Sequence, residues 1–299
     1  MTVIDPLAVA SPGRYRDDSV EVVRGGPVPA YADRTDSFAC WRDDGRVHLV
    51  HELPAEEIHN DLAGRVATEL FAGRLAGSEL FERLLTGIVV SSAPDPLDAW
   101  ESFYRNTLRL LGDLLAHEPA PTGEVPAAEG SLAGYAPVYR RARSLVGPGT
   151  VLELGSCFGF LSLLLASEHA VTASDLTANT VRLLGRVASR LGTTLDTLVC
   201  DAAEVPRPDR SYDTVVALHL LEHLEPDVGA AVVAEMQRLA EQRVVVAVPF
   251  EDVPSPEFGH VRVFTLADLA DLGAASGWDW RVEEHHGGWL VLDRPSPNR

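Results

Sequence analysis

The sequence predicts an α/β fold for the C-terminal half of the chain, preceded by a mainly helical N-terminal domain with a β-hairpin. After residue 150, short β-branched runs alternate with helical stretches, which is typical of a parallel sheet with helices on both faces. Before that point the apolar residues recur mostly at helical spacing. Between the two parts, the stretch 119–132 is rich in proline and glycine and predicts a linker. We therefore expect an N-terminal substrate or lid domain over 1–118, a linker over 119–132 and a second domain over 133–299.

The N-terminal elements follow from pattern and turn chemistry. Residues 1–36 are polar with little periodicity and predict an extended arm. Residues 37–52 predict a hairpin, because an Asp-Gly pair at 44–45 suits its turn. Apolar residues at helical spacing predict helix over 55–92 and an amphipathic helix over 97–117.

The C-terminal half predicts seven strands. Each is a short apolar or β-branched run, and the first five alternate with helical segments. The expected strands are 151–154, 170–174, 195–200, 214–218, 244–248, 280–284 and 289–293, and the expected helices include 158–167, 177–191 and 222–240.

Composition excludes several classes of function. All 25 basic residues are Arg, so the chain offers no lysine for a P-loop or a Schiff base. The net charge of −19 argues against a nucleic-acid partner, and no apolar run is long enough to span a membrane. The three cysteines are far apart, which argues against disulfides and a thiolate metal site and suits a reducing cytoplasm.

The segment 151–160 joins a buried strand to a helix through a glycine turn. Gly155 and Gly159 would let a ligand approach the backbone, and Asp175, twenty residues past Gly155, follows the next strand, where a carboxylate can accept both ribose hydroxyls. A dinucleotide would need glycine where Cys157 and Phe160 stand, whereas S-adenosylmethionine (SAM) has no phosphate to accommodate. Both cofactors fit so far.

Residues 133–299 resemble class I SAM-dependent methyltransferases. The resemblance rests on Glu153-Leu154-Gly155-x-x-x-Gly159, Asp175, Cys200-Asp201-Ala202, Tyr212–Val216, Leu221-Glu222-His223-Leu224, His260 with Arg262–Thr265, and Gly277-Trp278. It implies a Rossmann-like sheet of seven strands with a reversed last strand, and SAM as cofactor.

The resemblance also implies roles at the cofactor site. Glu153, Gly155 and Gly159 would surround the methionine part, with Cys157 in the same loop where the family often has glycine. Asp175 would bind the ribose, Asp201 would receive the adenine amino group, and Ala202 would lie beside the ring. His219 would lie near the sulfonium.

A fainter resemblance covers the whole chain. The segments 41–45 and 95–107 and the overall length are similar to mycofactocin oligosaccharide methyltransferases. That family is associated with O-methylation of a glucose in the sugar chain of a redox cofactor. It implies a glycosylated small molecule as the acceptor, and leaves the oligomeric state open.

A sugar hydroxyl is a poor nucleophile and needs a general base, for which His219 and His260 are the candidates at the carboxyl edge of the sheet. His219 and His223 also form an H-x-x-E-H string, as in zinc hydrolases, but His219 should close a strand, and we identify no third ligand and no metal site. Tyr135 and Tyr139 are candidate substrate residues. His285 and His286 are expected at an exposed hairpin tip.

Other functions remain open at this point. An amine acceptor would need no base, so the chain is also compatible with a small-molecule N-methyltransferase. A nicotinamide oxidoreductase and a non-catalytic scaffold that keeps the methyltransferase fold are further alternatives.

Overall fold

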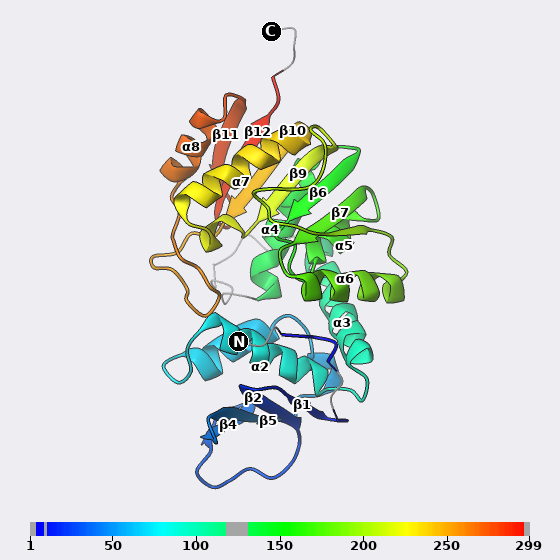
Figure 1. Ribbon diagram of the computed structural model, residues 1–299, viewed down its shortest axis with the longest axis vertical. Helices are drawn as coiled ribbons and strands as arrows, with labels where there is room; N and C mark the ends of the chain where they lie inside the picture. The colour runs from blue at the N-terminus through cyan, green and yellow to red at the C-terminus, as the bar shows by residue number, and fades with distance from the viewer. Residues whose placement is uncertain (1–3, 9–10, 118–130, 296–299) are drawn as a thin grey trace. The chain divides into compact units, whose positions relative to one another are not determined.

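The computed structural model describes residues 4–8, 11–117 and 131–295. The chain forms two compact units (Figure 1). Unit 1 comprises Met1–Ala136 with Pro256–Gly259, and unit 2 comprises Pro137–Ser255 with His260–Arg299. The expected linker, 119–132, lies outside the described residues except for Ser131 and Leu132. Among the described residues, no helix has the length and apolar character to cross a membrane.

Unit 2 is built on a seven-stranded sheet in the order β11-β12-β10-β9-β6-β7-β8. The strands β6 to β10 pair in parallel, whereas β12 is antiparallel to both β10 and β11. The prediction of a reversed last strand is therefore confirmed. The bounds are β6 (Thr150–Leu154), β7 (Ala170–Asp175), β8 (Asp196–Val199), β9 (Tyr212–Leu218), β10 (Ala240–Val248), β11 (Asp279–Glu284) and β12 (Gly288–Asp293).

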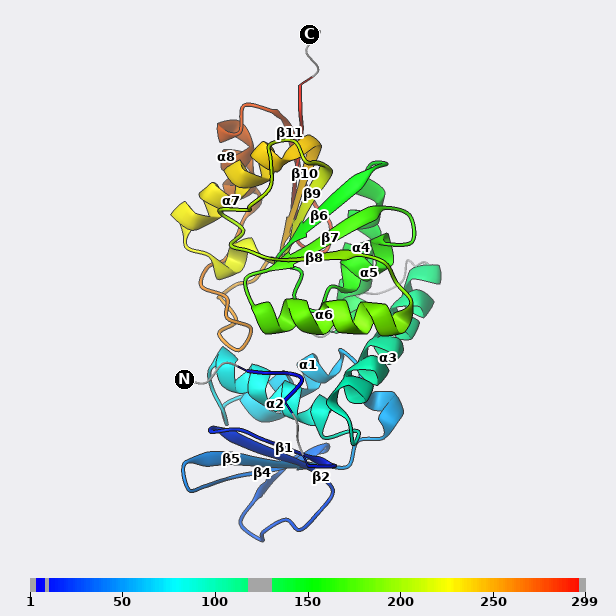
Figure 2. The ribbon, with the colours of Figure 1, turned by 45° about the vertical axis from the view of Figure 1, so that its right-hand side comes forward.

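Helices cover both faces of this sheet (Figure 2). One face packs on α4 (Leu132–Leu145) and α5 (Phe160–Leu165), and the other on α7 (Pro226–Leu239) and α8 (Leu266–Ala275). The helix α6 (Ala178–Leu191) follows β7 and contacts β7 and β8. Burial on both faces explains why the central strands are continuous apolar runs.

The chain reverses its direction of travel across the sheet at β6. From β6 it moves to β7 and β8 on one side, and then returns to β9 and β10 on the other. In such sheets, ligands bind in the crevice beyond the carboxyl ends of the strands on either side of the reversal. We therefore expect the functional site in the loops after β6, β7, β9 and β10.

Unit 1 contains a five-stranded sheet in the order β1-β2-β5-β4-β3. The expected hairpin is present as β4 (Phe38–Asp43) and β5 (Arg46–His51). The segment expected as an extended arm adds β1 (Arg14–Arg16), β2 (Val20–Arg24) and β3 (Asp33–Arg34). These strands have two to five residues, too few for a readable alternation, and β2 is fixed by packing on α2.

The helical part of unit 1 is more broken than its apolar spacing predicts. The segment 55–92 forms η1 (Ala55–Glu57), α1 (Leu62–Val66), a π-helical turn η2 (Ala67–Phe71) and α2 (Ser78–Val90). Gly73 and Gly77 interrupt it with φ of 81° and 98°, in the left-handed region that favours glycine. The helix α3 (Pro96–Ala116) matches the prediction for 97–117, and the Asp95 side chain caps its first turn by accepting from the N–H groups of Leu97 and Asp98.

Candidate active site

The loop between β6 and α5 turns sharply through left-handed backbone. Gly155, Cys157 and Gly159 have φ of 67°, 47° and 70°. A Cβ atom on Gly155 would lie 2.8 Å from Leu220, and one on Gly159 would lie 2.4 Å from Leu184. Both glycines are therefore required by backbone conformation and by close packing. The exposed Cys157 adopts a positive φ without being glycine.

The Asp175 carboxylate at the end of β7 holds this loop in place. Its Oδ2 accepts a hydrogen bond from the backbone N–H of Cys157 at 3.0 Å, and its Oδ1 accepts from Thr177 N–H at 2.9 Å. The next residue, Leu176, leaves 72% of its surface exposed. Sequence reasoning did not single out Leu176.

The end of β8 lies against the same place. The N–H of Cys200 donates to the backbone oxygen of Asp175 at 3.1 Å, so the two strand ends are adjacent. Asp201 follows, and its Oδ1 accepts from Ala203 N–H at 2.8 Å. Ala202 is half-buried against the core, and Val199 leaves 48% of its surface exposed. Two carboxylates and two exposed apolar side chains thus occur at neighbouring strand ends.

Glu153 is placed differently from these residues. It is buried in β6, and its Oε2 accepts a hydrogen bond from Ser162 Oγ of α5 at 2.5 Å. Burial raises the pKa of the Glu153 carboxyl to about 7, against the opposing hydrogen bonds from Ser162. The side chain therefore ties strand β6 to helix α5 beneath the glycine loop.

A second group of side chains lies beyond the ends of β9 and β10. His219 follows β9 with φ of 53°, and its N–H donates to Ala247 O at 2.9 Å. The 3-10 turn η3 (Leu221–His223) comes next. The two histidines of the H-x-x-E-H string therefore do not share a helix, as expected. Burial, helped by His260 and His223, lowers the pKa of His219 to about 4.

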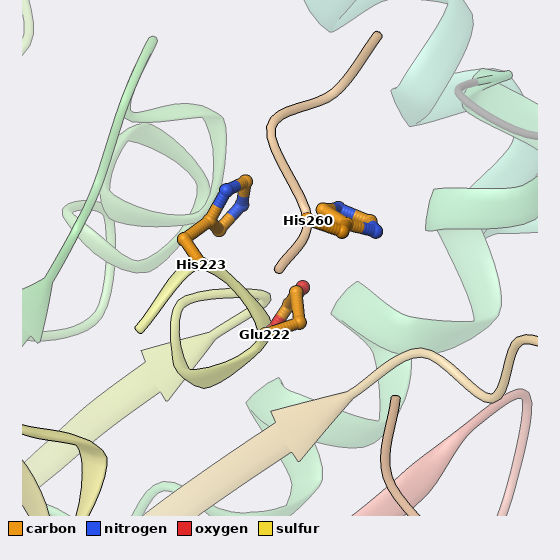
Figure 3. A group of neighbouring side chains, drawn as sticks. All are labelled: Glu222, His223 and His260. Carbon is orange, nitrogen blue, oxygen red and sulfur yellow. The ribbon is translucent and has the colours of Figure 1, made fainter. Parts of the chain in front are cut away.

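Glu222, His223 and His260 are neighbours within this group (Figure 3). Glu222 is buried, and its Oε1 lies 3.8 Å from His219 Nδ1. Burial raises the pKa of Glu222 to about 8, and the nearby Glu251 raises it further. The His223 and His260 rings meet edge to face with centroids 4.8 Å apart. We call His219, Glu222, His223, Glu251 and His260 the histidine cluster.

Glu251 fixes the orientation of His260. Its two carboxylate oxygens lie 2.9 and 2.8 Å from His260 Nδ1, and both side chains are more than nine-tenths buried. A carboxylate only accepts hydrogen bonds, so the proton shared in this contact is on His260 Nδ1. Sequence reasoning missed Glu251, although its position just after the β10 strand could have indicated it.

The remaining candidates come from α4 and from the turn between β11 and β12. Tyr135 and Tyr139 are both in α4, but Tyr135 belongs to unit 1, and Tyr139 packs against the core of unit 2. His285 and His286 are exposed in the turn between β11 and β12, as expected.

The donor set at the β7 and β8 ends fits SAM. Carboxylates at Asp175 and Asp201 suit ribose hydroxyls and an adenine amino group, and the exposed Leu176 and Val199 suit an apolar ring. The glycine loop lacks the open glycine positions that a pyrophosphate needs, because Cys157 and Phe160 stand there.

Comparison with known proteins finds a family that part of the chain resembles. Residues 151–243 match a family model described as "Methyltransferase domain". No curated protein matches the chain.

Solved structures with a similar fold include three methyltransferases. Magnesium protoporphyrin IX methyltransferase from Synechocystis PCC 6803 with bound SAM has a TM-score of 0.47 and 19% identity, covering 68% of this chain and 99% of that one. A SAM-dependent methyltransferase from Aquifex aeolicus has a TM-score of 0.43 and 17% identity, covering 52% and 86%. One from Methanosarcina mazei has a TM-score of 0.44 and 17% identity, covering 52% and 96%.

The family match and the strand order agree. Residues 151–243 are similar to a methyltransferase domain, and they lie within a Rossmann-like sheet of seven strands.

Proposed function

We propose that this enzyme transfers a methyl group from SAM to a hydroxyl of a glycosylated small molecule. The observation that carries the proposal is the Glu251–His260 pair, in which two buried side chains are hydrogen-bonded at the carboxyl edge of the sheet. An amine acceptor needs only to be neutral, whereas a hydroxyl needs a group that weakens its O–H bond. The histidine cluster supplies such a group.

Within the cluster, we assign this role to His260 rather than to His219. The pKa of His219 is lowered to about 4, chiefly by burial, so this ring takes up no proton near neutral pH. Glu251 holds His260 through Nδ1, which fixes the orientation of the ring, and we propose that Nε2 faces the acceptor.

The chemistry is an in-line displacement. When bound, SAM supplies an electrophilic methyl group on a sulfonium. The hydroxyl oxygen bonds to the methyl carbon as the carbon–sulfur bond breaks and its electron pair stays on sulfur. The hydroxyl proton leaves to solvent through the histidine cluster. The protein contributes alignment of the two reactants and exclusion of water.

At the cofactor side, we propose that Asp175 binds the ribose and that Asp201 receives the adenine amino group, with Ala202 beside the ring. Gly155, Cys157 and Gly159 form the backbone turn at the methionine part. Two observations support these roles: the ends of β7 and β8 are adjacent, and the glycine loop turns through left-handed backbone.

The sugar acceptor is supported by the resemblance to mycofactocin oligosaccharide methyltransferases. We extend the proposal to Tyr135 and Tyr139 as residues that contact the acceptor, because aromatic faces stack on sugar rings. In segment 95–107, which carries part of that resemblance, Asp95 caps α3, and Trp100, Phe103 and Tyr104 are buried in unit 1. Methylation of the oligosaccharide chain of mycofactocin, in the cytoplasm, is the specific form of the proposal.

The test is methyl transfer from labelled SAM to a panel of glycosides and amines. We expect methylated glycosides, and we expect His260→Gln to lower the rate about 10²–10⁴-fold while SAM affinity stays the same. His286→Gln, at the exposed hairpin tip, is the matched control and should keep the full rate. Methylation of amines only, or full activity of His260→Gln, would refute the proposal.

A further inference from the structure

We infer that the histidine cluster binds one first-row divalent metal ion through Glu222, His223 and His260. The three side chains each offer one ligand atom, and these atoms all lie within 4.8 Å of one another (Figure 3). Three donors bound tetrahedrally at about 2.1 Å from one ion would lie about 3.4 Å apart. Small side-chain rotations are therefore enough to bring the three atoms onto one ion.

Glu222 gives independent evidence that a ligand belongs here. The residue is 1% exposed, and neither of its carboxylate oxygens has a hydrogen-bond partner among the described residues. The nitrogen of His219 at 3.8 Å is beyond hydrogen-bond distance. A carboxylate buried in this way is costly unless it is paired with a cation. A bound metal ion would supply that cation.

The surroundings of His260 match those of a metal-bound histidine. Such histidines almost always donate their second ring N–H to a carboxylate or a carbonyl, which fixes the ring and raises the basicity of the ligand nitrogen. Here Glu251 accepts that hydrogen bond, and Ser255 Oγ donates to Glu251 at 2.8 Å. The N–H of Val261 donates to the backbone oxygen of Glu222 at 2.9 Å, which ties the His260 loop to the η3 turn.

The ligand types indicate which ions would bind. Two imidazoles and one carboxylate suit Zn²⁺, Co²⁺, Fe²⁺ or Mn²⁺, whereas Mg²⁺ and Ca²⁺ prefer oxygen ligands. Glu222 as a ligand and Glu251 hydrogen-bonded to His260 would together balance the charge of a divalent ion.

The catalytic use of the ion rests on the proposed function. Three protein ligands leave a coordination position open, and a hydroxyl held there would lose its proton to solvent more easily. His260 would then orient the ion instead of receiving the proton itself.

Binding is tested directly on the full chain without a histidine tag, freed of metal by chelation. Co²⁺ is titrated while its visible absorption is recorded, with Mg²⁺ as a comparison ion. We expect one Co²⁺ per chain, displaced by Zn²⁺, and no comparable binding of Mg²⁺. Glu222→Gln and His223→Gln should each weaken Co²⁺ binding at least about 10-fold, and Glu251→Gln by about 10–100-fold.

The control is a double variant of the exposed pair, His285→Gln with His286→Gln, which should bind Co²⁺ like the wild type. Circular dichroism of each variant checks that it is folded. Glu222→Gln keeps the size of the buried side chain and introduces no charge, so it should fold and it keeps the test decisive. Unchanged Co²⁺ affinity in folded Glu222→Gln and His223→Gln, or loss of binding in the control, would overturn the inference.

Activity separates this inference from the proposed function. If the metal-free enzyme methylates glycosides at the full rate, the catalytic use of the ion fails, the proposed function stands, and His260 acts directly as a base. If one equivalent of Co²⁺ binds at these three residues but no glycoside is methylated, the metal site stands and the proposed function fails.

Discussion

Replacing Gly159 with alanine should test how the glycine loop is built. Gly159 begins α5 with φ of 70° and ψ of 27°. A Cβ atom there would lie 2.4 and 2.8 Å from the two terminal methyl carbons of Leu184, which is itself buried. The substitution therefore combines a left-handed backbone at a non-glycine residue with a clash in a packed core.

The two costs can be added. Left-handed backbone costs about 1–2 kcal/mol for a residue with a Cβ atom, and overpacking a core typically costs about 1–3 kcal/mol. We expect Gly159→Ala to lower the free energy of unfolding by about 2–5 kcal/mol. Because the loop itself is displaced, SAM binding should weaken as well.

Gly192 provides the matched control for this experiment. It follows α6 with φ of 74°, and a Cβ atom there would meet nothing within 4 Å. Gly192→Ala should therefore show only the backbone cost, about 1–2 kcal/mol. Urea denaturation of both variants, followed by circular dichroism, measures the difference. Equal losses for Gly159→Ala and Gly192→Ala would refute the argument that Leu184 closes the space beside the loop.

Three further predictions concern pH, cofactor binding and a buried ion pair. Burial lowers the pKa of His51 to about 4, so as pH falls from about 6.5 the unfolded state takes up a proton that the folded state refuses. Between pH 7.5 and 5.0 the free energy of unfolding of the wild type should fall by roughly 2 kcal/mol more than that of His51→Gln. Urea denaturation of both proteins at the two pH values measures this difference, and an equal fall in both would contradict the prediction. Asp175→Ala should weaken SAM binding roughly 10²–10⁴-fold and Asp201→Ala roughly 10–100-fold, because each lost charge-assisted hydrogen bond is worth about 1.5–3 kcal/mol. Calorimetric titration measures the affinity, and an unchanged affinity in both variants would refute the proposed SAM site. Arg83 is buried and lies 2.6 Å from Asp17. Replacing Arg83 with Met should lower the free energy of unfolding, measured by urea denaturation, by about 3–5 kcal/mol, because the Asp17 carboxylate loses its partner. Adding Asp17→Asn to the same chain should recover part of that loss.

Local pattern was enough to predict unit 2 because its strands are buried on both faces. A run such as Val244–Val248 is apolar throughout, so it is recognisable without knowledge of its neighbours. The same holds for α3, where Asp95 and Pro96 mark the first turn. Fewer elements of unit 1 could be predicted from sequence, because β1 to β3 are short and depend on strand pairing and on packing against α2.

The cofactor side of the candidate site was also readable from sequence. Gly155, Gly159, Asp175 and Asp201 lie at strand ends, and the parallel order of the sheet brings strand ends together. Leu176 was not readable, because the exposure of a leucine depends on what folds over it.

The parallel sheet, the glycine loop and the strand-end carboxylates could be predicted from the sequence, because each depends on residues near one another in the chain. The folded chain was needed to show that Glu222, His223, Glu251 and His260 form one cluster. Up to 38 positions separate these residues along the chain, and the β9–β10 pairing and one hydrogen bond from Val261 bring them together. Tertiary structure also decided that the Glu222 carboxylate is buried, and burial is what makes a cation its natural partner.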